Sequence, residues 1–504
     1  MKTLLCKIFE MNIRYFSLFL IHFCTLILLS VSVAYSQPKR LQFTHITNDD
    51  GLSSSVVTSV LQDHKGLVWI GTFDGLNRYD GFGFVVYRNN SADSSSLTNN
   101  VVRTMIEDHN KNLLIGTQRG LCLYDRDKNR FINYMIDKSS PLRGIDCVVS
   151  KIAEDSLGNL WLATNIGLIY FDRIKNQIIK YIHDLSDPGS ISYDYVEAVL
   201  LDKNNRLWIT TRKGLNLFLP ETGTFNHITK SENETDDLSD ISFTDMTEDR
   251  EGNLWFGSTA GLYCLKNTHE GKITNLIHYF YDPHDKFSLS INQIKSLFVD
   301  DSNNLWIGTE NGGLNLLDRD NNRFWHYFKD DYDPKSLNNE SIQTIYQDRI
   351  GNLWIGTFTG GLNIAMGNMD AIISYQNLPG APFSLSHNTV TCFLEDHNDQ
   401  IWVGTDGGGL NLFNGKTNRF RRFNMENSRL SSNAILCILE DSNNQIWFGS
   451  WAGGLIRYNT NNKSFTLLTT KNSGILDNNI YAMAEGYNND LWLGSFEHGL
   501  IRDT

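Results

Sequence analysis

Apolar and polar residues follow one another in blocks along this chain, and the order of the blocks repeats. A clear unit runs from Ile435 to Tyr458, with an apolar run, Glu-Asp, a polar turn, a short apolar strand containing tryptophan, a glycine pair and a third apolar stretch. From the third unit onward the tryptophans are 45 to 51 residues apart, and a further unit has Leu114 in this place. Ten units of this length, each with several short strands, predict a repeat architecture. The nine tryptophans are Trp69, Trp161, Trp208, Trp255, Trp306, Trp354, Trp402, Trp447 and Trp492.

Each unit predicts four strands. In the first unit they cover residues 56–61, 68–72, 75–80 and 84–87. The second strand is apolar at successive positions, which is typical of a strand covered on both faces. Four-stranded blades packed around an axis provide that cover, so the pattern favours a β-propeller. A right-handed β-helix is the main rival, although its coils are usually shorter, and the strand-like runs with many glycine turns exclude an α-solenoid.

Propellers typically have about four to eight blades, so ten units do not fit one ring. The seventh unit ends irregularly at residues 364–368, and we place the boundary there. We therefore predict an all-β fold of four-stranded antiparallel blades: a seven-bladed β-propeller over residues 37–368, then an incomplete second β-propeller, its first three blades, over 369–504. Residues 41–46 would pair with the third strand of the Trp354 unit and close the first ring, and residues 371–375 would close the second. The sequence stops inside the third strand of unit ten, so we expect a piece of a longer protein.

The N-terminus has the pattern of an export signal. Lys2, Lys7 and Arg14 are basic, residues 15–33 are apolar or hydroxylic except for one histidine, and residues 34–36 form a small-x-small cleavage site. We predict a signal peptide over residues 1–36 and a periplasmic mature chain. The alternative is an uncleaved anchor, since the apolar stretch is just long enough to span a bilayer.

Charge and cysteine content exclude several classes of function. The formal net charge is −13 and there is no basic run, so nucleic-acid binding through phosphate contacts is not expected. The seven cysteines show no CxxC spacing and read as small buried hydrophobes. We predict no metal site and no cofactor.

An aspartate recurs after the first strand of nine units. A catalytic pair needs two carboxylates that converge on one bond, whereas these recur once per unit beside turn residues, where aspartate bonds its own backbone. We therefore predict a structural role for them and no catalytic residues. The nine are Asp63, Asp108, Asp155, Asp202, Asp249, Asp300, Asp348, Asp396 and Asp441.

Turns that vary while the repeat stays constant are the informative positions. Strand direction places the turns between second and third strands on the same rim as the connectors between units; we call it the variable rim. Its turns carry exposed aromatic, charged and amide groups, a combination suited to carbohydrate binding. Trp451 stands where other units have Glu310 or Gln118, so it either binds ligand or covers the neighbouring blade. The ligand-binding candidates are Phe73, Asp74, Arg119, Arg212, Lys213, Glu310, Phe358, Trp451, Phe496 and His498.

The units resemble a known family. Residues 294–315 and 342–363 meet nearly in full the pattern V-x-x-I-x-x-D-x-x-G-x-L-W-I-G-T-x-x-G-G-L-N, which is similar to the two-component regulator propeller repeat. The resemblance covers about residues 41–504. Departures are Leu114 for tryptophan, Ala163 and Thr210 for glycine, and Gly486 for aspartate.

The resemblance implies the exported sensor half of a hybrid two-component sensor histidine kinase of gut-type bacteria. In that family two seven-bladed rings precede a β-sandwich, a membrane helix and the kinase, and the signals are commonly glycan fragments. The expected partner is an oligosaccharide or another small ligand, with membrane contact only through the signal segment or through parts beyond this sequence, and the longer protein could dimerise. No kinase motif is visible, so we expect no enzyme activity in this chain; the alternatives are a propeller polysaccharide lyase or glycosidase, and a protein-interaction scaffold.

Overall fold

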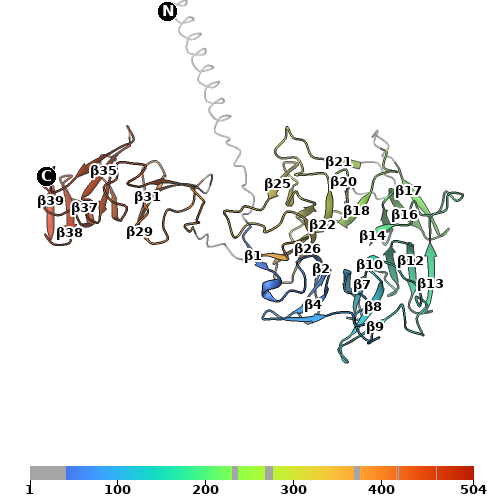
Figure 1. The fold of residues 1–504 in the computed structure, drawn as a ribbon. Helices are drawn as coiled ribbons and strands as arrows, with labels where there is room; N and C mark the ends of the chain where they lie inside the picture. Colours follow the sequence, from blue (N-terminus) through green and yellow to red (C-terminus); the bar gives the residue numbers. More distant parts are fainter. Residues whose placement is uncertain are drawn as a thin grey trace, which may run out of the picture.

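The computed structural model describes residues 41–229, 237–266, 276–367, 375–415, 417, 419–460 and 462–503. These residues form an all-β structure of nine four-stranded antiparallel sheets and one three-stranded sheet, with a single turn of 3-10 helix, η1 (Asn48–Asp50) (Figure 1). Each sheet is one sequence unit, and we call the sheets blades 1 to 10 in chain order. The predicted all-β class and four-stranded blades are confirmed for nine units.

Strand bounds repeat from blade to blade. The first strands are β2 (Val57–Gln62), β6 (Val102–Glu107), β10 (Val149–Glu154), β14 (Val196–Leu201), β18 (Phe243–Glu248), β22 (Ile294–Val299), β26 (Ile342–Gln347), β29 (Val390–Glu395), β33 (Ile435–Glu440) and β37 (Ile480–Glu485). The second strands are β3 (Val68–Thr72), β7 (Leu113–Thr117), β11 (Leu160–Thr164), β15 (Leu207–Thr211), β19 (Leu254–Ser258), β23 (Leu305–Thr309), β27 (Leu353–Thr357), β30 (Ile401–Thr405), β34 (Ile446–Ser450) and β38 (Leu491–Ser495).

The outer two positions of each blade follow the same scheme. The third strands are β4 (Gly75–Tyr79), β8 (Gly120–Asp125), β12 (Gly167–Asp172), β16 (Leu215–Leu219), β20 (Leu262–Leu265), β24 (Leu314–Asp318), β28 (Leu362–Ala365), β31 (Gly409–Asn414), β35 (Leu455–Asn459) and β39 (Leu500–Asp503). The fourth strands are β5 (Phe84–Tyr87), β9 (Arg130–Asn133), β13 (Gln177–Tyr181), β17 (Thr224–Ile228), β21 (Leu276–Tyr279), β25 (Arg323–Tyr327), β32 (Arg419–Phe423) and β36 (Ser464–Leu468), and β1 (Phe43–Ile46) takes this place in blade 7.

Blades 1 to 7 close into a ring. Their first strands contact one another in cyclic order, and β26 of blade 7 contacts β2 of blade 1. Strand β1 pairs antiparallel with β28, with Phe43 opposite Ala365 and Ile46 opposite Leu362. The prediction that residues 41–46 pair with the third strand of the Trp354 unit is therefore confirmed, and the pairing joins the two ends of the ring (Figure 1).

The apolar core lies between neighbouring blades. Trp69 of blade 1, for example, packs in one cluster with Val102 and Ile115 of blade 2. Every residue of the second strands in blades 1 to 7 is buried, as the uninterrupted apolar pattern predicted. Gly71 shows how close the blades approach, since a Cβ there would lie 2.6 Å from Val102 Cγ1.

Blades 8, 9 and 10 pack in a row through β29, β33 and β37. Val390, which opens β29, is 45% exposed, whereas Val57 and Ile435 at the same place in β2 and β33 are fully buried. Blade 8 thus has an apolar face without the cover that its counterparts have. Of the predicted closing strand at residues 371–375, positions 371–374 lie outside the described residues; the ring of Tyr375 packs on Phe413 of blade 8 at 4.9 Å.

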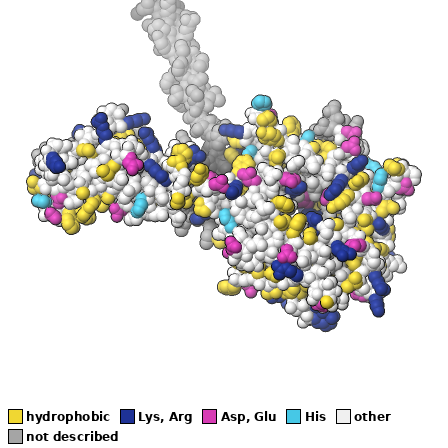
Figure 2. Space-filling view, viewed as in Figure 1, with side chains coloured by type: hydrophobic (Ala, Val, Ile, Leu, Met, Phe, Trp, Pro, Cys, Tyr) yellow, Lys and Arg dark blue, Asp and Glu magenta, His cyan; other side chains and the backbone are white. Residues whose placement is uncertain are grey.

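The predicted export signal, residues 1–36, also lies outside the described part of the chain. Among the residues that the structure describes, no helix has the length and apolar character needed to cross a membrane. On the face drawn in Figure 2, hydrophobic, basic and acidic side chains are mixed over the blades rather than gathered in one patch. No patch of one kind of side chain therefore marks a site on that face.

Candidate functional site

Seven of the recurring aspartates hydrogen-bond within their own blades. In seven blades the tryptophan indole N–H donates to the carboxylate oxygen Oδ2 of the aspartate six residues earlier, at 2.8 to 2.9 Å. In blade 1 the other oxygen, Oδ1 of Asp63, accepts the backbone N–H groups of Lys65 and Leu67. These bonds fix the turn after the first strand, in agreement with the structural role predicted for these carboxylates.

In three blades an arginine from the next blade also binds this carboxylate. Arg126 of blade 2 lies 2.6 Å from Asp63 and 2.8 Å from Glu107, and Arg173 of blade 3 lies 2.9 Å from Asp108. Burial by itself raises the pKa of the Asp63 carboxyl, but the hydrogen bonds from Trp69 and Arg126 outweigh it and hold that pKa below its ordinary value. The Asp63 and Asp108 carboxylates are therefore engaged in contacts that link neighbouring blades.

The variable rim has the geometry that strand direction predicted. In each of several blades the first residue of the turn between the second and third strands donates its backbone N–H to the connector just before the first strand, as Phe73 does to Val56 and Arg212 to Tyr195. Turns and connectors are thus bonded together on one rim. In blades 2, 4 and 6 the side chain of this turn residue contacts the second residue of the first strand, in the pairs Gln118–Arg103, Arg212–Glu197 and Glu310–Lys295.

Five of the predicted site residues lie on blades 1, 2 and 4. Arg212 bonds Glu197 at 2.9 Å and its guanidinium lies 3.7 Å from the ring centre of Tyr195; this hydrogen bond raises the pKa of the Arg212 guanidinium. Phe73 is partly exposed beneath the guanidinium of Arg103. The other three contact residues that do not line the axial cavity. Asp74 and Arg119 form ion pairs with Arg88 and Asp146, and the Lys213 ammonium lies over the ring of Tyr193.

The remaining candidates divide between the ring and the later blades. Glu310 pairs with Lys295 at 2.8 Å, and Phe358 is 47% exposed. Trp451 of blade 9 contacts Phe496 of blade 10 edge-on, with ring centres 5.6 Å apart, and both rings remain partly exposed. His498 lies 3.6 Å from a carboxylate of blade 10. Trp451 therefore does touch the neighbouring blade, and it does so as part of an exposed aromatic cluster.

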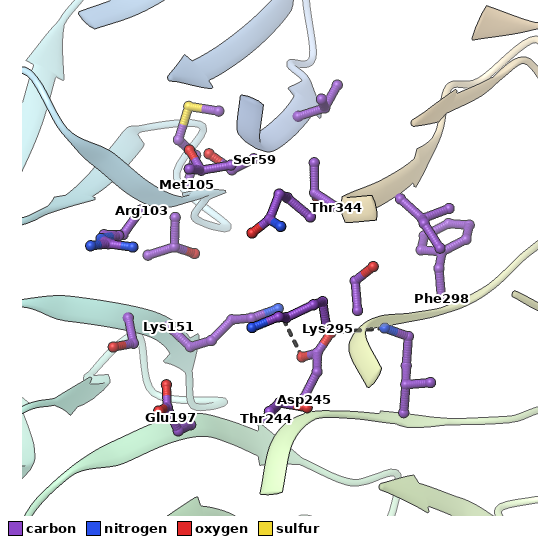
Figure 3. A pocket seen from close by; sticks show the side chains of 18 of the residues that line it. Ser59, Arg103, Met105, Lys151, Glu197, Thr244, Asp245, Lys295, Phe298 and Thr344 are labelled. Atoms are coloured by element: carbon purple, nitrogen blue, oxygen red, sulfur yellow. Dashed lines mark hydrogen bonds and ion pairs between the residues drawn. The ribbon is translucent and has the colours of Figure 1, made fainter. Parts of the chain in front are cut away.

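A cavity of about 330 Å³ occupies the axis of the ring (Figure 3). It is lined by the first strands of all seven blades, together with Tyr195 and Val148 from connectors. Each first strand shifts register against its second strand between its first and third residues, which leaves the second residue as the extra residue of a β-bulge. All seven bulge residues line the cavity. They are Thr58, Arg103, Ser150, Glu197, Thr244, Lys295 and Gln343.

The bulge position does not itself require charge. Where it is threonine, the hydroxyl bonds the next blade, as Thr58 does to the Val102 carbonyl at 2.6 Å and Thr244 to the Ile294 carbonyl at 2.8 Å. Where it is Arg103, Glu197 or Lys295, the side chain instead reaches the turn of its own blade on the variable rim. The charged residues are thus departures from a neutral pattern.

A further ion pair crosses the cavity. Lys151, the third residue of β10, lies 3.0 Å from Asp245 of blade 5 and so passes over blade 4, where the corresponding residue is Ala198. The second oxygen of Asp245 accepts the backbone N–H of Leu297 at 3.0 Å. Figure 3 shows the Lys151 and Lys295 side chains extending into the cavity from different strands.

Sequence reasoning missed the cavity charges. The signal was present: Arg103, Lys151, Glu197, Asp245 and Lys295 are charged residues at the second or third position of a first strand, where the uncharged units among the first seven have Thr, Ser, Gln or Ala. Of the predicted candidates, the structure brings Phe73, Arg212 and Glu310 to the mouth of the cavity, and their partners are cavity residues. The other seven lie elsewhere on the rim or on blades 9 and 10.

Metal or thiol chemistry finds no support in the described residues. No group of three or more histidine, cysteine or acidic side chains there could hold a metal ion. Cys122 and Cys264 are buried, and burial raises the pKa of their thiols to about 11 and about 12. Both are poor nucleophiles in this state and act as core residues.

Six of the blades match a known family of propeller repeats. The model of the family described as "Two component regulator propeller" matches residues 51–74, 237–260, 288–311, 336–359, 384–407 and 429–452. The chain carries two-component regulator propeller repeats. Each matched repeat covers the first two strands of a blade. Blades 2, 3 and 4 lie outside the matched segments, and they carry Leu114, Ala163 and Thr210 as well as three of the cavity charges.

Proteins similar to this chain include signalling proteins. Over 86 residues the chain is 43% identical to "Histidine kinase P4" of Formosa agariphila, which covers 17% of this chain and 6% of the kinase. The extracellular domain of BT3049 from B. thetaiotaomicron, described as a hybrid two-component system, is similar with a TM-score of 0.72 and 26% identity over 92% of this chain and 59% of that one. The extracellular domain of BT4673 from the same organism matches with a TM-score of 0.54 and 23% identity over 92% and 58%. The chain thus spans under two thirds of each.

Proposed function

We propose that this chain is the extracytoplasmic, ligand-sensing region of a hybrid two-component system. The observation that carries the proposal is the likeness to the BT3049 extracellular domain, which extends over 92% of the chain at 26% identity. The propeller repeats and the local identity to a histidine kinase support it. In this proposal the chain is exported to the periplasm, has no catalytic activity of its own, and belongs to a longer protein anchored in the inner membrane.

The proposed domains follow the packing of the blades. Residues 1–36 are a signal peptide, residues 37–368 form a seven-bladed propeller, and residues 369–504 are the first three blades of a second propeller. The cyclic contacts of blades 1 to 7 and the pairing of β1 with β28 support the first ring. The exposed apolar start of β29 supports the second, because a further blade would cover it as each preceding blade covers its neighbour.

We place the ligand on the variable rim and propose a glycan. Sugar rings stack on aromatic faces and their hydroxyls need fixed polar partners, and this rim offers both. Phe73, Arg212 and Glu310 surround the mouth of the axial cavity, and the ion pairs of the latter two hold them in place. Trp451 and Phe496 form the aromatic cluster on blades 9 and 10.

Titration of a glycan panel with the full chain tests this proposal. Stacking of one ring on an aromatic side chain is worth roughly 1–3 kcal/mol in nucleic-acid sites, so Trp451→Ala should weaken a bound glycan about tenfold or more. Arg212→Ala should weaken a ligand at the cavity mouth. The matched control is Phe82→Ala, which removes an aromatic ring that is 99% exposed in the turn between β4 and β5, on the opposite rim.

Two outcomes would contradict the proposal. If neither Trp451→Ala nor Arg212→Ala changes affinity while circular dichroism shows an intact fold, the variable rim is not the site. If no glycan of the panel binds the wild-type chain, glycan sensing is wrong. The link to a kinase has its own test, since the gene should continue in frame beyond codon 504 into a kinase domain.

A polysaccharide lyase or glycosidase is the second candidate, because carboxylates from two different blades line the axial cavity. Glu197 and Asp245 both line the cavity. Each is already engaged, Glu197 by Arg212 and Asp245 by Lys151 and a backbone N–H, which leaves neither poised to exchange a proton with substrate. New reducing ends or unsaturated products on incubation with a bound oligosaccharide would favour the enzyme; a protein scaffold would instead retain a partner protein and bind no sugar.

A further inference from the structure

The charged residues that line the axial cavity include one cation without a carboxylate partner among the described residues. Three cations and two anions line it: Arg103, Lys151 and Lys295 against Glu197 and Asp245. Both cavity lysines form ion pairs with carboxylates, Lys151 with Asp245 and Lys295 with Glu310. The Glu197 carboxylate forms an ion pair with Arg212. Arg103 has no carboxylate partner among the described residues.

Arg103 is held in place by neutral groups. Its Nε and Nη2 both donate to the side-chain oxygen of Gln118, at 2.9 and 2.6 Å, and its guanidinium carbon lies 5.3 Å from the ring centre of Phe73. No hydrogen bond in the described structure uses Nη1. A half-buried guanidinium positioned by an amide and an aromatic ring, with donors still available, is well suited to receive a carboxylate.

We infer that the axial cavity binds a compact, hydroxyl-rich ligand that carries a carboxylate, a sugar acid, with the carboxylate on Arg103. The inference rests on the proposed sensing function and assigns it a ligand class. The overall charge of −13 would repel anions from most of the surface, so an anionic ligand needs a local site such as this one.

The rest of the cavity matches the other half of such a ligand. Its neutral bulge residues, Thr58, Ser150, Thr244 and Gln343, present hydroxyl and amide groups around the axis. The volume of about 330 Å³ accommodates one sugar ring and no long chain. Lys151, on the strand next to that of Arg103, is paired with Asp245 of blade 5 at 3.0 Å, which leaves Arg103 as the cavity cation for the carboxylate.

Two sugars that differ at one carbon provide the probe. D-galacturonate has a carboxylate where D-galactose has a hydroxymethyl group, and the two rings are otherwise the same. We expect calorimetric titration of the full chain to show at least tenfold tighter binding of galacturonate than of galactose. The preference should shrink as salt is added, because the contact is ionic.

Arg103→Gln leaves a shorter, neutral polar side chain, and it should reduce galacturonate affinity at least tenfold and so remove most of the preference for galacturonate over galactose. The matched control is Arg130→Gln, which removes an exposed arginine from β9, the outermost strand of the same blade. Arg103→Lys should restore part of the affinity, since it returns the charge without the planar guanidinium.

Each result has a separate meaning. Equal binding of galacturonate by wild type and Arg103→Gln, or tighter binding of galactose than of galacturonate, overturns the sugar-acid site and leaves glycan sensing standing. Failure of every sugar in the wider panel overturns both. Loss of galacturonate binding in Arg130→Gln to the same degree as in Arg103→Gln would show a general charge effect and also overturn the site.

Discussion

We predict that closure of the ring depends on one aromatic side chain in the first described strand. Phe43 of β1 is 3% exposed and packs with Trp306, Ile342 and Ala365 of blades 6 and 7. Its backbone N–H donates to the Lys335 carbonyl at 2.8 Å. Phe43→Ala keeps that backbone bond and removes the ring that anchors the closing strand.

The expected effect follows from the burial. Replacing a buried phenylalanine by alanine typically costs about 3–5 kcal/mol, because the transfer free energy is lost and a cavity remains. If β1 detaches as a unit, this cost appears as a smaller free energy of local opening. Hydrogen exchange of the β28 amides should then accelerate by roughly 100-fold or more, since about 1.4 kcal/mol corresponds to tenfold.

The control is Ile179→Ala in β13, the fourth strand of blade 3. Ile179 occupies an equivalent outer strand but is 51% exposed, so exchange in its blade should change little. Mass-spectrometric exchange that resolves the peptide containing β28 is the assay. If Phe43→Ala accelerates exchange there no more than Ile179→Ala does, β1 does not hold the ring closed and the reasoning is wrong.

Two more predictions concern the blade turns and interfaces. Burial raises the pKa of the Asp63 carboxyl, but its hydrogen bonds outweigh burial and lower that pKa below 3.8 in the folded state. The stabilisation from the ionised carboxylate is therefore present above pH 3.8 and is lost as pH falls through the folded-state pKa. Asp63→Asn should lose less unfolding free energy than wild type between about pH 6 and about pH 3, and an equal loss would contradict this. Gly71→Ala should cost about 1–3 kcal/mol in chemical denaturation, because its Cβ would lie 2.3 Å from Ser59 Oγ and 2.6 Å from Val102 Cγ1. Gly83→Ala, with no atom within 4 Å of the added Cβ, is the control, and equal costs would refute the packing argument.

The sequence by itself determined the blades. Strand order, the buried second strands, the structural aspartates and the closing role of residues 41–46 could all be predicted, because each depends on periodicity within one unit or on a count of units. A tryptophan that recurs every 45 to 51 residues, with an aspartate six residues before it as in Asp63 and Trp69, forms the same local bond in seven blades. Strand direction alone also placed the turns and connectors on one rim.

Only the tertiary structure decided which residues meet at the axis. Arg103, Lys151, Glu197, Asp245 and Lys295 come from five different units, and ring closure is what brings them to one cavity. The bulge matters as much, because one extra residue in each first strand interrupts the two-residue alternation by which a strand's faces are assigned. The residues of a single strand do not determine its register against the next strand. The sequence pattern therefore shows these charges as exceptions but does not predict that they face the axis.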